Sequence, residues 1–425
     1  MSFVLCLVCV LLVPLASAGL TLMHKGLGRS RSAAQAMLSS LCVLAVTAIV
    51  FVLFGFSWAG VAGQASHEVF LHGAPWSCLG ALPLFARAVR FDGSPDALAL
   101  CLQMFAVGLA GMIPISAGAD RWRLVSICLF SALLAGIIYP LFSHWVWGGG
   151  WLAQLGVNLG IGAGFIDAGG SGVIQVTGGL AALSVAWIIG PRRGKYTEDG
   201  MATAIPGHDI SSVLFGCILA LMGWIGLNAA ASLLFYGVTP AGIARVVVNT
   251  TLCAAASSLA AMGTTQLRYG KPDASLSANG WVAGLAAGSA GCAFISPAAS
   301  IVTGLAAGIV VTWLVEVLEL KLYIDDPGGA ISVHAGAGIL GLLSAGLFAN
   351  VGSVSSRGQF LAQLIGVATL LGFMLPLIHT CNWLLNKIVR YRVDATGDWQ
   401  GMDIRELGAG AYPEFVIHSD EFVPR

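Results

Sequence analysis

One ionisable side chain lies inside an apolar stretch near the C-terminal end of the chain. His334 is the one titratable residue between positions 328 and 350, a segment comparable to the ~20 residues that cross a bilayer core. A titratable ring at that depth is costly and normally faces the interior of a helix bundle or a pore. The imidazole could exchange protons near neutral pH, or it could be a core histidine satisfied by a neighbouring carbonyl group. His334 alone leaves both roles open.

A second apolar stretch repeats the layout around His334. Asp326 precedes His334 by eight positions, and Asp167 precedes Gln175 by the same number. The two later side chains are 159 residues apart (334 − 175), and about five membrane spans fit between them. Repeats offset by an odd number of spans are inverted, and such repeats place their shared site near the bilayer midplane. The spacing therefore predicts a shared site at Gln175 and His334.

The composition requires a membrane protein with several spans. Of the 425 residues 57% are hydrophobic and 9% are charged, and the mean hydropathy is +0.87, whereas soluble domains carry roughly 25% charged residues. The 56 glycines suit closely packed helices in lipid. A net charge of zero gives no indication of a nucleic-acid partner.

The sequence does not favour metal, redox or enzymatic chemistry. Ten cysteines are scattered, and the pair Cys6 and Cys9 has no second pair or histidine cluster to complete a metal site. The aqueous loops contain no nucleophile–base pair or phosphate-binding loop. We expect a protein that is not an enzyme and that carries no metal or cofactor.

Eleven spans are expected. An apolar run ending at Ala16-Ser17-Ala18 resembles a signal peptide with its cleavage site, but no Lys or Arg precedes it, so a retained first helix is predicted. The spans are expected near residues 2–22, 35–58, 98–117, 123–146, 170–190, 209–236, 241–263, 276–295, 298–318, 328–350 and 359–387.

Basic residues predict the orientation of these spans. The loops after the odd-numbered spans hold most of the Lys and Arg residues, and the positive-inside rule places such loops in the cytoplasm. The N-terminus is then outside and the C-terminus inside, as an odd number of spans requires. Residues 1–390 form the predicted membrane domain and residues 391–425 a cytoplasmic tail, in a cell membrane. The basic residues in the loops after the odd-numbered spans are Lys25, Arg29, Arg31, Arg121, Arg123, Arg192, Arg193, Lys195, Arg268, Lys271 and Lys321.

With these features in place, the chain resembles the ammonium transporter family (Amt/Mep/Rh), and its Amt branch in particular, along nearly its whole length. The resemblance implies an all-helical fold of two inverted five-helix repeats plus an eleventh helix, a homotrimer, and one narrow pore in each subunit. The motifs that carry it are 19–30, Ala119-Asp120-Arg121, 145–150, 167–179, 190–194, 223–228, 325–338 and 401–412.

The resemblance also implies roles for individual residues. Family members recruit ammonium in an outer vestibule with an aromatic at the position of Trp147, and a cation over an indole face gains about 0.5 to 2 kcal/mol. Trp147 could equally be an interfacial belt residue. Asp167 and Asn228 lie near the vestibule and hold the architecture, with Asp326 as the structural counterpart of Asp167. Asp167 could cap a half-helix rather than bind substrate.

The family's pore lining is altered at its proton relay. Family members line an apolar conduit with two histidines and are thought to pass neutral ammonia after removing a proton, because a bare ion is prohibitively expensive there. His334 matches the second histidine, but Gln175 replaces the first. An amide does not titrate in the accessible range, so a paired-imidazole relay cannot operate. Gln175 could still orient His334 and offer its carbonyl to ammonia.

The gate positions differ as well. Ala106 occupies the outer gate position, where family members have phenylalanine, and the neighbouring Phe105 points about 100° away on an ideal helix. A local distortion could still bring Phe105 into the pore. Leu227 occupies the inner gate position, and Ala231 replaces a serine that often helps to recruit ammonium.

The tail keeps its motif with two changes, Leu407 and Ala409, in place of the usual histidine and glutamate. In the family this tail couples subunits, and bacterial members dock a PII-type signal protein, which is retained as a candidate partner. Three functions follow: transport of ammonium or ammonia, with methylammonium as an analogue; a non-conducting ammonium sensor; and an electroneutral channel for ammonia or another neutral gas.

Overall fold

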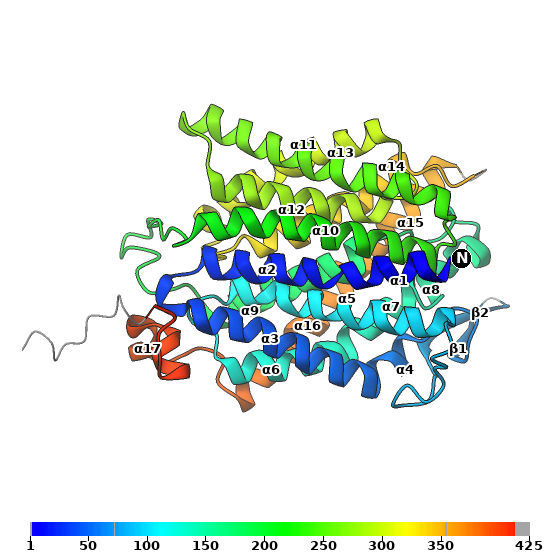
Figure 1. Ribbon diagram of the computed structural model, residues 1–425, viewed down its shortest axis with the longest axis horizontal. Coiled ribbons are helices and arrows are strands. Elements are labelled where there is room, and N and C mark those ends of the chain that lie inside the picture. Colours follow the sequence, from blue (N-terminus) through cyan, green and yellow to red (C-terminus); the bar gives the residue numbers. More distant parts are fainter. Residues whose placement is uncertain (1, 72, 353–354, 413–425) are drawn as a thin grey trace, which may run out of the picture.

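The computed structural model describes residues 2–71, 73–352 and 355–412. Long helices lie side by side along the longest axis of the molecule (Figure 1). The N-terminus lies at the end of the bundle that carries strands β1 (Ser66–Leu71) and β2 (Ala74–Gly80), here called the hairpin end. Helix α17 (Ala395–Gln400) lies at the opposite end, here called the tail end. The chain therefore crosses the bundle an odd number of times.

Ten helical segments among the described residues are long and apolar enough to cross a membrane. A further helix, α12 (Ala274–Gly291), is less apolar and is buried between α11, α13 and α14. Together they follow the eleven expected spans in order, and the predicted all-helical fold is confirmed. The helices are α1 (Phe3–Leu12), α2 (Pro14–Leu27), α3 (Ala33–Val50), α4 (Phe56–Ala59), α5 (Pro95–Ala117), α6 (Leu124–Leu133), α7 (Tyr139–Val146), α8 (Trp151–Leu159), α9 (Thr177–Ile189), α10 (Ile210–Phe235), α11 (Ile243–Tyr269), α13 (Pro297–Glu316), α14 (Ala337–Phe348), α15 (Ser356–Thr369) and α16 (Leu375–Ile388).

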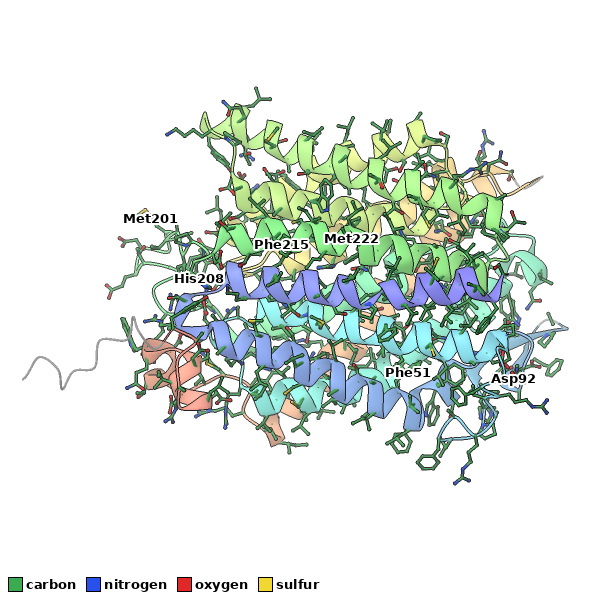
Figure 2. All side chains as sticks on the ribbon, viewed as in Figure 1. Phe51, Asp92, Met201, His208, Phe215 and Met222 are labelled. Carbon is green, nitrogen blue, oxygen red and sulfur yellow. The ribbon has the colours of Figure 1, made fainter. Side chains whose placement is uncertain are left out.

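The outer surface of the bundle is apolar along its length, and polar loops lie at its two ends. Phe215 and Met222 are 56% and 47% exposed on α10 (Figure 2). Asp92 lies at the hairpin end, whereas Met201 and His208 lie at the tail end (Figure 2). An apolar belt between two polar ends is the surface that a bilayer requires, and the chain is a multi-pass membrane protein.

Small residues bring the helix backbones into contact. A side chain at Gly223 of α10 would place its Cβ 2.0 Å from the backbone nitrogen of Ala16 on α2. Backbones can approach so closely only where one helix presents a glycine, and such contacts drive helix association in lipid. The glycine content of the sequence therefore reflects helix packing.

The hairpin of β1 and β2 was not anticipated from the sequence. The two strands pair antiparallel from Ser66 with Gly80 to Leu71 with Ala74. His144 of α7 holds the hairpin, because its Nε2 lies 2.9 Å from Ser77 Oγ while its Nδ1 lies 2.9 Å from the carbonyl oxygen of Ala59. This buried histidine has a structural role in docking the hairpin.

The described part of the tail packs against the helix ends. The carboxylate of Asp403 accepts hydrogen bonds from the backbone N–H groups of Ala34 (3.1 Å) and Gln35 (2.8 Å) at the start of α3. Leu407 is half-buried and Ala409 is exposed. Positions 413–425 of the predicted tail lie outside the described residues.

Candidate functional site

Two matching half-helices enter the bundle from opposite ends, and each begins with an aspartate. Asp167 Oδ2 accepts hydrogen bonds from the N–H groups of Gly172 (2.8 Å) and Val173 (2.9 Å). Asp326 Oδ2 accepts one from the N–H group of Ile331 (2.7 Å). Both carboxylates thereby satisfy backbone donors that a helix start leaves free. The equal spacing in the sequence reflects this repeated construction.

The half-helices bring Gln175 and His334 into contact. They belong to the π-helical segments Ser171–Val176 and Ile331–Gly336, and Gln175 Oε1 lies 2.7 Å from His334 Nδ1. The side chains are 0% and 4% exposed. With the amide oxygen toward the ring, Nδ1 carries the proton and the Nε2 of a neutral ring keeps its lone pair. The carbonyl of Gln175 is thus occupied by His334.

The amide nitrogen of Gln175 is a buried donor without a partner among the described residues. An unpaired buried donor costs about 1 to 3 kcal/mol, so it marks a position where another molecule can accept a hydrogen bond. This is the reverse of the sequence expectation, in which Gln175 offered its carbonyl.

Gly338 allows the two segments to cross at this point. A Cβ at Gly338 would lie 2.7 Å from Cγ2 of Val176 and 3.5 Å from Cβ of Gln175. Any side chain here would push the half-helices apart and lengthen the contact between Gln175 and His334.

Trp147 lies nearer the hairpin end, directly after α7. Its indole Nε1 donates a hydrogen bond to the backbone oxygen of Asp167 (2.8 Å), and the side chain is 3% exposed. Phe235 stacks on it, with ring centroids 4.7 Å apart and ring planes 14° apart. The next residue, Tyr236, accepts a hydrogen bond from the N–H group of Asp167 (2.7 Å). The structure therefore joins Trp147 and Asp167 with two aromatic residues from the end of α10.

The structure separates the four gate positions into two groups. Ala106 of α5 and Leu227 and Ala231 of α10 are fully buried, and these helices are in contact. Phe105 instead lines a groove of about 440 Å³ together with residues of α2 and α3 that include Leu22, Met37 and Leu41. Helix α5 is continuous through this position, so no distortion turns Phe105 toward α10, and its ring lies against α2 and α3 instead.

Asn228 lies against the loop that follows Asp167. Its Nδ2 donates to Thr250 Oγ1 (2.9 Å), and a Cβ on Gly169 would fall 2.1 Å from its Oδ1. Asn228 is thus placed to support the turn into the first half-helix.

A cavity of about 320 Å³ opens at the tail end of the second half-helix. Asn279, Asp326 and Ser332 line it, and each presents an oxygen with no partner among the described residues. Ser332 lies two residues before His334. The Gln175 and His334 pair therefore lies between the Trp147 region and a polar cavity.

A model of the Ammonium Transporter Family matches residues 4–412. This chain belongs to the ammonium transporter family. It is 35% identical over 443 residues to ammonium transporter Amt2 of Archaeoglobus fulgidus, covering 99% of this chain and 90% of the relative. It is 30% identical to the ammonium transporter of Bacillus subtilis, covering 96% and 97%. A solved structure titled "Sensor Amt Protein" aligns with a TM-score of 0.85 at 26% identity, covering 95% of this chain and 98% of that one.

Sequence reasoning missed two residues of this ammonium transporter family member. The sequence around Phe235 does not by itself indicate a functional role, although positions 227, 231 and 235 lie on one face of a helix. His24 of α2 lies within the first family motif, where neither its type nor its spacing indicates a role. It is 4% exposed, and its Nδ1 has no partner among the described residues.

Buried ion pairs fix the loop before the second half-helix of this family member. Both oxygens of Asp325 accept hydrogen bonds from the Arg192 guanidinium (2.9 Å each), and Arg121 Nη1 lies 3.7 Å from Asp325 Oδ2. Arg192 also pairs with Asp120 at 3.2 Å. Burial acts to raise the pKa of the Asp325 carboxyl, but Arg121 and Arg192 outweigh it and hold that pKa well below its usual range. Asp325 therefore stays ionised and anchors Asp326, its neighbour.

Replacing Asp167 with alanine is expected to destabilise this protein by about 2 kcal/mol, because it removes a cap and leaves two buried donors unpaired. Asp167→Asn should cost less, since its amide oxygen still accepts. Thermal unfolding in mild detergent measures both. Asp199→Ala, which removes an exposed carboxylate in the loop after Arg192, is the control. Equal unfolding temperatures for Asp167→Ala and the control would contradict the capping role.

Proposed function

We propose that this protein conducts ammonia across a cell membrane, drawing it from ammonium at the hairpin end and passing it through a narrow pore in each subunit. The observation that carries the proposal is the buried contact between Gln175 and His334 at the meeting of two inverted half-helices. Family membership supplies the substrate class.

The donor and acceptor that Gln175 and His334 leave free suit neutral ammonia better than ammonium. Ammonium has four donors and no lone pair, whereas ammonia can accept a hydrogen bond. The free Gln175 amide nitrogen is a donor, so it matches the lone pair of ammonia and has nothing to offer ammonium. His334 Nε2 can accept from the same ammonia molecule. An ion would in addition pay the cost of entering a buried apolar site.

Recruitment would take place at the hairpin end. Trp147 supplies an indole face for ammonium, and Asp167 lies beside it. Ammonium would return its proton to the water at the hairpin end, and neutral ammonia would then pass the apolar residues Ala106, Leu227 and Ala231. Because Gln175 cannot relay that proton, transport by the native protein is expected to be electroneutral.

The test uses purified protein in proteoliposomes. An inward ammonium gradient should alkalinise the lumen faster than in empty vesicles, while the ammonium-evoked current stays at the empty-vesicle level. Methylammonium serves as a second substrate, and replacement of ammonium by potassium serves as the control. Alkalinisation no faster than in empty vesicles would overturn conduction.

An ammonium sensor that does not conduct is the second candidate. The similarity to a solved protein titled "Sensor Amt Protein" favours it, as does the amide in the relay. It would be supported by absent flux together with a cytoplasmic partner that binds the protein only in the presence of ammonium.

The number of subunits and the orientation of the protein in the membrane are part of the same proposal. We propose a homotrimer with the hairpin end outside, the tail 391–425 in the cytoplasm, and a PII-type signal protein as a candidate partner at the tail end. A single monomer mass in mild detergent would contradict the trimer.

A further inference from the structure

The indole face of Trp147 is already occupied by an aromatic ring. Phe235 lies parallel to it, with centroids 4.7 Å apart, and Trp147 is 3% exposed. A cation binds an indole within about 6 Å of the ring centroid. The ring of Phe235 therefore fills the volume in which an ammonium ion would lie against this face of Trp147, and the near-complete burial of the side chain leaves the site closed in this conformation.

Phe235 is the outermost member of a row on α10. Leu227, Ala231 and Phe235 follow one another at intervals of four residues, so they share one helix face. Leu227 and Ala231 are fully buried below it, whereas Phe235 is half-buried. Because Ala231 has a small side chain, the row supplies one aromatic ring, and that ring lies at the entrance.

The position of Phe235 allows the ring to leave without disturbing the helix. Phe235 is the last residue of α10. Two positions later Gly237 has a φ of +61°, and the chain turns away from the helix there. Tyr236 is anchored by its hydrogen bond to Asp167 and by an edge contact with Phe294 (5.7 Å). The backbone is thus held beside the site while the Phe235 ring can rotate about its own side-chain bonds.

We propose that Phe235 is the outer gate of the pore and competes with ammonium for the indole face of Trp147. Position 106 is alanine and Phe105 faces another groove, so the gating ring comes from α10 instead of α5. The inference rests on the proposed recruitment of ammonium at Trp147. Its consequence is that ammonium enters only by displacing Phe235, and larger cations are hindered further.

The first test compares Phe235→Ala with the native protein in the proteoliposome assay. The ammonium concentration that gives half-maximal alkalinisation is expected to fall by about fivefold, the effect of removing one competing aromatic contact. The preference for ammonium over methylammonium should also fall. Phe70→Ala removes a ring of β1 at the same end that is 73% exposed, and it should leave both quantities unchanged.

The second test measures access without transport. Ala231→Cys places a thiol directly below the gate, and a small cationic methanethiosulfonate should label it at least about tenfold faster when Phe235→Ala is added, as expected when a fully buried thiol becomes accessible. Buried native Cys253 reports loosening of the fold and should stay unlabelled. If Cys253 becomes reactive, Phe235→Leu replaces Phe235→Ala, since leucine keeps apolar volume without the stacking ring.

The two tests separate the gate from the function. The native protein could conduct ammonia while the substitutions at Phe235 change neither the ammonium dependence of flux nor the labelling rate of Ala231→Cys. That result would overturn the gate. Absent flux in every variant with faster labelling of Ala231→Cys would overturn conduction and keep Phe235 as the barrier above Ala231. Absent flux with unchanged labelling would overturn both.

Discussion

Gln175→His is expected to give this protein an ammonium-evoked current that the native protein lacks. The amide oxygen of Gln175 lies 2.7 Å from His334 Nδ1, so a histidine at 175 would place a second titratable ring within hydrogen-bond reach of the first. A proton could then pass from ring to ring while ammonia moves beside them. We expect the current to exceed the empty-vesicle background by on the order of a hundredfold, the lower end of what a positioned proton-transfer group contributes.

The controls for this prediction separate proton transfer from packing. Gln175→Leu keeps a similar volume but removes the hydrogen bond, and it should produce no current. Gln175→His combined with His334→Gln restores one imidazole and one amide in exchanged positions, and it should also be silent. Luminal alkalinisation is recorded alongside each current, because a variant that neither conducts ammonia nor carries charge has lost the pore.

A native protein that already carries the same current would contradict the prediction. His24 would then be the first group to examine, because it is buried and its Nδ1 has no partner among the described residues, whereas both ring nitrogens of the buried His144 are occupied. Loss of that current in His24→Gln would assign the second proton carrier to α2. Its persistence would leave His334 acting without an imidazole partner.

Much of this site follows from local sequence rules. An aspartate that precedes a polar residue by eight positions satisfies the first free N–H groups of a half-helix, and this rule located Asp167, Asp326, Gln175 and His334. The spans follow from hydropathy and length, since each must cover the bilayer core. These features depend on short segments of the chain and on the uniformly apolar interior of the bilayer, so they can be predicted from the sequence.

Other features depend on contacts between distant segments. The stack of Phe235 on Trp147 joins residues 88 positions apart (235 − 147) through the packing of α7 and α10. The orientation of the Gln175 amide is decided by the His334 ring across two half-helices. The rotation of α5 turns Phe105 into a groove against α2 and α3. Neither hydropathy nor spacing within one element carries this information.

Asp325→Asn is expected to cause the largest loss of stability, about 3 to 5 kcal/mol, because it removes the carboxylate that two buried guanidinium groups share. In the native protein Asp325 accepts hydrogen bonds from Arg192 and lies 3.7 Å from Arg121, and all three side chains are almost fully buried. Asparagine keeps the shape but not the charge, so Asp120 would be left to pair with Arg192 at 3.2 Å, and Arg121 would lose its carboxylate partner. Unfolding in mild detergent measures the loss, and Asp199→Asn, an exposed acid in the loop that follows Arg192, is the matched control.

The pH dependence of this loss identifies its cause. The folded pKa of Asp325 is depressed, so its contribution to stability is complete above the unfolded value of about 4 and is lost as the pH falls toward the folded value. The difference between native protein and Asp325→Asn should therefore be constant near neutral pH and should shrink below about pH 4. Ammonia flux should fall with the substitution as well, because Asp325 holds the loop from which Asp326 caps the half-helix that carries His334. A difference that stays constant down to the acid limit of folding would show that packing, rather than the charge of Asp325, fixes this loop.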